Sequence, residues 1–97
     1  MASTLSNKVA IISGGSRGIG KAIALKLAQE GCDCLLAAMS EQNLQAAADE
    51  IRASTGRTVH VCSSDLRTSE GCQAVFDLAQ SAFGRADILI NLSLIHI

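Results

Sequence analysis

Three glycines near the start of the chain have the spacing of a phosphate-binding loop. Gly14, Gly18 and Gly20 follow a short apolar run at residues 8–13 and precede a segment of helical periodicity. Glycine permits the positive φ values of a tight turn, and its missing Cβ lets a pyrophosphate approach the backbone. The helix that follows offers unpaired N–H groups and the positive end of its dipole. The strand–loop–helix context therefore predicts a dinucleotide-phosphate loop.

Two alternative interpretations of these glycines stay open. Residues 15–21 also fit the first seven positions of the P-loop pattern G-x-x-x-x-G-K. The eighth residue is Ala22, where Mg²⁺ binding requires a Ser or Thr hydroxyl. A phosphotransferase of this type would bind Mg-nucleotide. The remaining alternative is a glycine-rich turn that binds no ligand.

The elements that must position this loop alternate between short apolar runs and longer helical patterns. Strands are predicted at residues 8–13, 32–39, 58–62 and 87–91. Helices are predicted from residue 19 to a cap at Gly31, from Ser40 to Gly56, and from Thr68 or Ser69 to Gly84. The apolar stripe of the third helix is predicted to be Cys72, Val75, Phe76, Ala79 and Phe83. The order β-α-β-α-β-α-β requires a parallel sheet covered by helices, so the predicted fold class is α/β.

Length, composition and charge limit the classes of protein to which the chain can belong. The 97 residues are 48% hydrophobic and 18% charged, which is too apolar for a disordered chain and enough for one small domain. A net charge of −1 gives no electrostatic basis for binding nucleic acid or an anionic membrane. The longest apolar run is too short to span a bilayer, and the N-terminus has no signal-like core, so we expect a cytoplasmic protein.

The four cysteines are interpreted as buried or half-buried thiols that pack as small hydrophobic residues. Neither a C-x-x-C pair nor a histidine at metal-ligand spacing accompanies Cys32, Cys34, Cys62 or Cys72. We therefore predict no metal site and no disulfide.

Residues 8–91 as a whole resemble the short-chain dehydrogenase/reductase family. Residues 13–20, S-G-G-S-R-G-I-G, are similar to its fingerprint T-G-x-x-x-G-I-G, with Ser13 in place of the leading Thr. Residues 65–66 resemble its D-[VL] adenine contact, and residues 83–91 resemble the F-G-x-[IVL]-D-[IVL]-[LI]-[IV]-N segment. The resemblance implies a Rossmann-type sheet and makes residues 1–91 the N-terminal part of an NAD(P)-binding domain. Within the family the chain looks most like the 3-oxoacyl-[acyl-carrier-protein] reductases.

The resemblance also assigns cofactor-binding roles to residues at three strand ends. Those that shape or line the pyrophosphate loop are Gly14, Ser16, Arg17, Gly18, Ile19 and Gly20. Asp65 would accept a hydrogen bond from the adenine amino group, with Leu66 beside the ring. Asn91 would lie near the cofactor at the end of the fourth strand.

The choice of cofactor depends on the end of the second strand. NAD-preferring folds place an acidic residue there, which binds the ribose 2′-hydroxyl and repels a 2′-phosphate. Residues 36–40 contain no carboxylate, and the first carboxylate after this strand belongs to Glu41. Arg17 supplies a permanent cation and Ser40 a hydroxyl donor for a 2′-phosphate. We predict NADP(H) as the preferred cofactor, with NAD(H) as the alternative.

The family transfers hydride between the nicotinamide and a small carbonyl or alcohol substrate, using a Tyr with a Lys three residues later and a Ser. This chain contains no tyrosine, so no catalytic residue is assigned and these residues alone are expected to be inactive. The resemblance implies that the full-length protein is a homo-oligomer. The alternative function is a non-enzymatic dinucleotide-binding module.

Residues 92–97 depart from the family pattern, which requires an N-A-G or C-A-G element here. The sequence L-S-L-I-H-I is the translation of CTG TCT CTT ATA CAC ATC, the mosaic end of a transposon-based sequencing adapter. We therefore interpret the tail as adapter translation. In the family's strand order, 3-2-1-4-5-6-7, the fourth strand would then be an unpaired apolar edge beside an exposed apolar face, which predicts aggregation.

Overall fold

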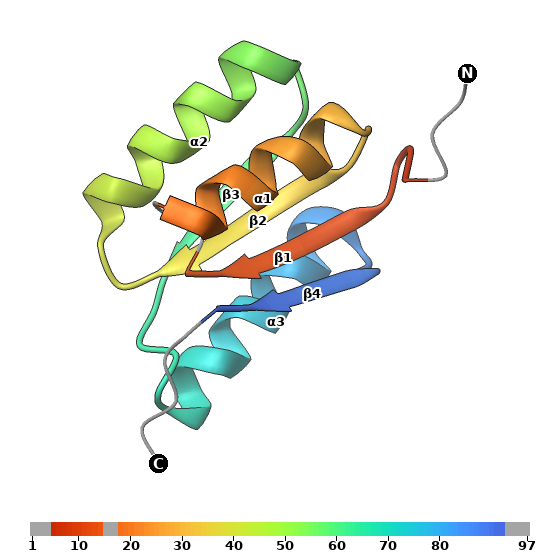
Figure 1. The fold of residues 1–97 in the computed structure, drawn as a ribbon. Coiled ribbons are helices and arrows are strands. Elements are labelled where there is room, and N and C mark those ends of the chain that lie inside the picture. The colour runs from red at the N-terminus through yellow and green to blue at the C-terminus, as the bar shows by residue number, and fades with distance from the viewer. Residues whose placement is uncertain (1–4, 15–17, 93–97) are drawn as a thin grey trace.

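The computed structural model describes residues 5–14 and 18–92. Strands and helices alternate along the chain, as predicted (Figure 1). The elements are β1 (Val9–Ser13), α1 (Gly18–Gln29), β2 (Asp33–Ala38), α2 (Glu41–Thr55), β3 (Val59–Ser63), α3 (Ser69–Phe83) and β4 (Ile88–Asn91). Each predicted segment is confirmed to within about two residues. None of the helices in the described part of the chain is long and apolar enough to cross a membrane.

The four strands form one parallel sheet in the order β3-β2-β1-β4, which confirms the α/β class and the predicted strand order. β1 lies between β2 and β4, so that Ile11 is opposite both Leu35 and Leu89. From β1 the chain crosses first to β2 on one side and, after β3, returns to β4 on the other side. This reversal of direction makes the carboxyl ends of β1 and β4 a topological switch point, where open α/β sheets bind their ligands.

Polar caps fix where the second and third helices begin and end. The Ser40 hydroxyl oxygen accepts the Asn43 N–H at 3.2 Å, and the Thr68 hydroxyl oxygen accepts the Gly71 N–H at 2.9 Å. Each side chain satisfies one of the N–H groups that have no partner within the helix. Gly56 and Gly84 end the two helices with φ of 71° and 74°, a conformation that glycine adopts without steric cost.

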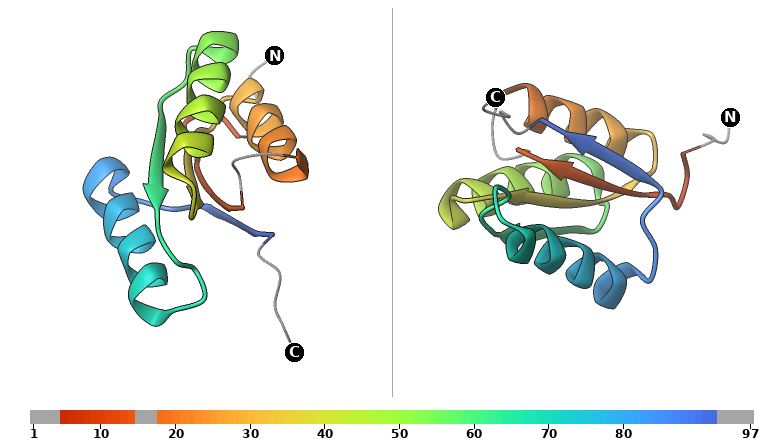
Figure 2. Two further views of the ribbon diagram at one scale, coloured as in Figure 1. Left: turned by 90° about the vertical axis from the view of Figure 1, so that its left-hand side faces the viewer. Right: turned by 90° about the horizontal axis from the view of Figure 1, so that it is seen from below.

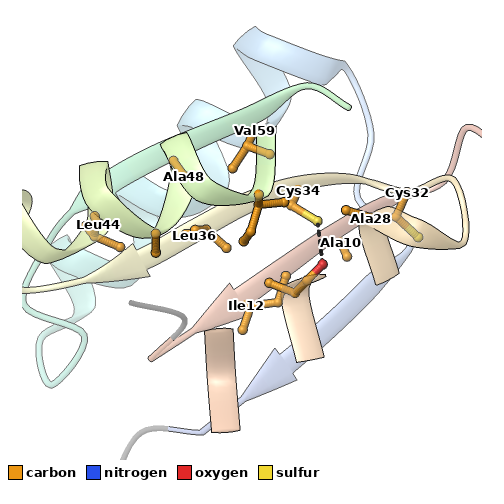
Figure 3. Close-up of a cluster of buried hydrophobic side chains, with 12 residues drawn as sticks. Ala10, Ile12, Ala28, Cys32, Cys34, Leu36, Leu44, Ala48 and Val59 are labelled. Atoms are coloured by element: carbon orange, nitrogen blue, oxygen red, sulfur yellow. Dashed lines mark hydrogen bonds between the residues drawn. The ribbon is translucent and has the colours of Figure 1, made fainter. Parts of the chain in front are cut away.

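One face of the sheet is covered by α1 and α2, and the larger hydrophobic cluster lies between these layers (Figure 2). Figure 3 shows Ile12, Leu36 and Val59 of the sheet directed into the same cluster as Leu44 and Ala48 of α2. Complete burial of side chains of this size contributes about 1.5–3 kcal/mol each. The core therefore holds together the two helices whose N-termini follow β1 and β2.

The opposite face is covered by α3, the one helix that lies there in the described part of the chain (Figure 2). Val75 and Ala79 are buried against Ile11, Leu35 and Ala37, as the predicted stripe requires. The prediction is wrong for the burial of two other stripe residues, since Cys72 is exposed and Phe76 is 47% exposed. The physical reason is that a pocket separates them from Leu89 of β4, which is itself 57% exposed.

Candidate functional site

The loops that follow the four strands meet at the carboxyl edge of the sheet. The predicted cofactor-binding residues lie in these loops. Backbone hydrogen bonds tie the loops together: Gly14 N–H donates to Ala37 O at 2.7 Å, Ser64 N–H to Ala38 O at 2.9 Å, and Leu92 N–H to Ser13 O at 3.2 Å. The parallel pairing therefore places Gly14, Ser40, Asp65 and Asn91 along one edge.

Two of the described loop glycines have the positive φ values that a tight turn requires. Gly14 and Gly18 have φ of 80° and 62°. Among the described residues outside its own helix turn, no atom lies within 4 Å of the position that a Cβ on Gly18 would take, so the need for glycine there is conformational. Gly20 is buried in the first turn of α1, whereas the side chain of Ile19 is 74% exposed. Ser16 and Arg17 lie outside the described residues.

A side-chain hydrogen bond joins β1 to β4 at the switch point. The Ser13 hydroxyl lies 2.9 Å from Asn91 Oδ1, to which it donates, and Ser13 is only 7% exposed. Because Ser13 and Asn91 are also opposite each other in the sheet register, this bond fixes the orientation of the Asn91 amide. Sequence reasoning identified Ser13 only as the first residue of the motif, and the partnership depends on strand order.

Ser40 combines two positions that matter for the site. It follows β2 at the carboxyl edge, and its hydroxyl oxygen caps α2. A hydroxyl that accepts one hydrogen bond keeps its own O–H as a donor. Glu41 follows in the first turn of α2, and its Oε1 accepts a hydrogen bond of 3.4 Å from Gln45 Nε2.

Asp65 is held by a neighbour that the sequence did not single out. Arg67 donates to its carboxylate from three nitrogens: the backbone N–H (3.0 Å) and Nε (2.9 Å) bind Oδ1, and Nη2 (3.1 Å) binds Oδ2. These hydrogen bonds lower the pKa of Asp65, so the carboxyl group is ionised at neutral pH. The signal available in the sequence was the spacing D-x-R, which allows an Asx turn closed by a guanidinium.

Leu66 borders an apolar pocket of about 100 Å³ between α3 and the β1–β4 pair. Its lining residues are Ile11, Ser13, Leu66, Cys72, Val75, Phe76, Leu89 and Asn91. The pocket reaches the switch point through Ser13 and Asn91. An apolar surface that ends in polar groups can accept a flat heterocycle whose edge forms hydrogen bonds.

The two buried cysteines, Cys32 and Cys34, provide no reactive group. Burial raises the pKa of Cys34 to about 12, and its thiol donates toward Ala24 O at 3.8 Å (Figure 3). Burial also raises the pKa of Cys32, and both thiols therefore stay protonated. Within residues 5–14 and 18–92, no three His, Cys, Asp or Glu side chains are grouped so as to hold a metal ion.

Comparison with known proteins identifies similar chains. The profile of the short chain dehydrogenase family matches residues 8–93. An uncharacterised oxidoreductase of Mycobacterium tuberculosis is 45% identical over 87 residues, which are 90% of this chain and 33% of that protein. L-sorbose reductase from Gluconobacter frateurii, solved with NADPH and L-sorbose, superposes with a TM-score of 0.94 at 39% identity. That match covers 100% of this chain and 37% of the reductase.

A third similar structure has a different bound cofactor. A xylitol dehydrogenase solved with NAD⁺ superposes with a TM-score of 0.84 at 29% identity, over 89% of this chain and 33% of that one. The chain thus spans about a third of the length of the proteins that it matches. Similar folds occur with NADPH and with NAD⁺, so fold similarity alone does not select between the two cofactors.

Proposed function

The chain belongs to the short-chain dehydrogenase family, and from this premise we propose that it binds the nicotinamide dinucleotide of an oxidoreductase that interconverts a carbonyl and an alcohol. The observation that carries this proposal is the position of the glycine loop. It opens at the β1–β4 switch point, between a buried strand and the N-terminus of α1. When bound, the nicotinamide ring would donate or accept the hydride.

The family resemblance assigns nine of the residues proposed to bind the dinucleotide: Gly14, Ser16, Arg17, Gly18, Ile19, Gly20, Asp65, Leu66 and Asn91. Ser40 is added for its hydroxyl at the end of β2. The positive φ values of Gly14 and Gly18 support a pyrophosphate position beside the first turn of α1. Asp65, ionised and directed by Arg67, would accept the adenine amino group. Asn91, oriented by Ser13, would face the nicotinamide half.

We propose NADP(H) as the preferred cofactor. The support is chemical: Ser40 keeps a donor at the end of β2, and Arg17 adds a cation in the loop. Residues 36–40 carry no carboxylate that would repel a 2′-phosphate. The carbonyl or alcohol substrate and the self-association of the whole protein are proposed from the family resemblance alone. Residues 1–91 are proposed as the family domain, with residues 92–97 outside it.

The alternative function is a dinucleotide-binding module without catalysis. Both candidates require dinucleotide binding, and hydride transfer from NADPH to a carbonyl, assayed with the full-length protein, would distinguish them.

Substitution of Gly18 by Ala tests the proposed binding loop. A Cβ at a positive φ costs about 1–2 kcal/mol, and the changed loop would no longer present its N–H groups to the pyrophosphate. We expect NADPH affinity, measured by calorimetric titration of the 97-residue chain, to fall about tenfold or more.

Gly56→Ala is the matched control, because Gly56 has φ of 71° and equally open surroundings but ends α2 away from the loop. It should lose similar stability and keep wild-type affinity. Equal affinities of the two variants, or no NADPH binding by the wild-type chain, would contradict the proposed site.

A further inference from the structure

Asp65 is held at its backbone as well as at its carboxylate. Its carbonyl oxygen accepts the Thr68 N–H at 3.1 Å and the Thr68 hydroxyl at 2.9 Å. Thr68 in turn caps α3. The segment that carries Asp65 is therefore attached directly to the first turn of a helix.

Gly71 allows this attachment. A Cβ on Gly71 would lie 1.9 Å from the Asp65 carbonyl oxygen and 2.6 Å from its carbonyl carbon, closer than any side chain tolerates. The Asp65 backbone thus packs against α3 where only glycine leaves room. Any larger residue at position 71 would displace Asp65.

The Arg67 contacts leave the Asp65 carboxylate few positions at which it can accept further hydrogen bonds. An ionised carboxylate has about four acceptor positions on its two oxygens. The Arg67 N–H and Nε occupy two on Oδ1, and Nη2 occupies one on Oδ2. About one position, on Oδ2, is left for a further donor. The guanidinium itself is directed at Asp65, while the Arg67 side chain is 72% exposed.

We propose that Arg67 is a positioning residue that sets base specificity: by fixing the Asp65 carboxylate it leaves one acceptor position, which selects a base carrying an amino donor over one carrying a 6-oxo group. This inference rests on the proposed function. An unrestrained carboxylate samples several rotamers, and ordering it on binding costs free energy. Arg67 makes that restraint before the ligand binds.

The test measures the affinity of the 97-residue chain for NADPH and for its deaminated analogue, reduced nicotinamide hypoxanthine dinucleotide phosphate. The wild type is expected to bind NADPH about tenfold more tightly, the size of one hydrogen bond to a charged group. Arg67→Gln should reduce the ratio of the two affinities to about twofold by weakening the binding of NADPH alone. The analogue is unaffected because it has no amino group to donate a hydrogen bond to Asp65. Arg67→Lys keeps the charge without the planar fork and should give an intermediate ratio.

Arg85→Gln is the matched control. Arg85 forms the same kind of two-nitrogen pair with Asp87, two residues later, just before β4 begins. The substitution removes the same charge far from the carboxyl edge and should leave the ratio at its wild-type value.

The other outcomes separate this inference from the proposed function. If Arg67→Gln weakens both ligands by one factor, the guanidinium acts on a phosphate or on the fold, and the inference fails. An unchanged ratio in Arg67→Gln, or a wild type that binds both ligands equally, also overturns it while dinucleotide binding stands. If the wild type binds neither ligand, the proposed function fails and the inference fails with it.

Discussion

Ser13 and Asn91 show how a single side-chain contact connects the fold to the site. The 2.9 Å hydrogen bond lies between the two strands of the switch point, and Ser13 is almost completely buried. A part-buried hydrogen bond of this kind contributes about 1 kcal/mol, and its loss would remove the contact by which Ser13 orients the Asn91 amide.

Ser13→Ala is therefore expected to lower the free energy of unfolding by about 1 kcal/mol, measured by urea denaturation. It should also weaken NADPH binding a few-fold, because the Asn91 amide loses its hydrogen bond to Ser13. Ser13→Thr keeps the hydroxyl and is the control, with both quantities close to wild type. Unchanged stability in Ser13→Ala would mean that the contact is not formed in solution.

Strands β1 and β4 are joined at their other end by an acidic side chain. Asp87 Oδ2 accepts the Val9 N–H at 2.8 Å, and the carboxylate also pairs with Arg85. The Arg85 hydrogen bond and then the Val9 N–H lower the pKa of Asp87. The ionised carboxylate thus closes the start of the β1–β4 pair.

This pair predicts a pH-dependent contribution to stability. Since the folded-state pKa of Asp87 lies below its unfolded value of about 3.9, the contribution is complete above that pH. It is lost as the pH falls through the folded value. Asp87→Asn should have a lower Tm than wild type at pH 7, and this difference in Tm should disappear in strong acid. A difference that is constant with pH would contradict the ionic origin.

How much the sequence could predict varies with the element. Glycines and capping hydroxyls mark helix ends locally, so Ser40, Gly56 and Gly84 were identified correctly. The exposure of Phe76 could not be predicted, because a helical stripe does not reveal which part of it meets a sheet. Arg67 was missed for a related reason, since its role depends on the turn that brings it back to Asp65. Ser16 and Arg17 lie outside the described residues, and the cofactor-binding roles of all the predicted site residues stay predictions.

At the scale of the whole molecule, the two faces of the sheet differ in how completely they are covered. Two helices pack on one face, and α3 packs on the other against the cluster of Ile11, Leu35 and Ala37. Leu89 and Phe76 stay exposed beside β4, whose outer edge pairs with no strand of the described chain. An apolar edge strand of this kind favours association between molecules.

Leu89→Lys should therefore reduce self-association of the 97-residue chain, measured by sedimentation velocity over a range of concentrations. A charge on an exposed edge strand opposes pairing and leaves the buried core unchanged. Met39→Lys is the control. It makes the same kind of change at a side chain that follows β2 and is 62% exposed, and it should self-associate like wild type. Equal association of all three proteins would exclude the β4 edge as the contact.

The central place of β1 also determines when the sheet can be completed during synthesis. β1 ends at Ser13, but its partner β4 ends at Asn91, 78 residues later. At a translation rate of 5–20 residues per second, roughly 4–16 s separate the synthesis of the two strands. During this interval one edge of β1 has no strand to pair with. Substitutions that slow β4 pairing are therefore expected to lower the yield of folded protein more than its equilibrium stability.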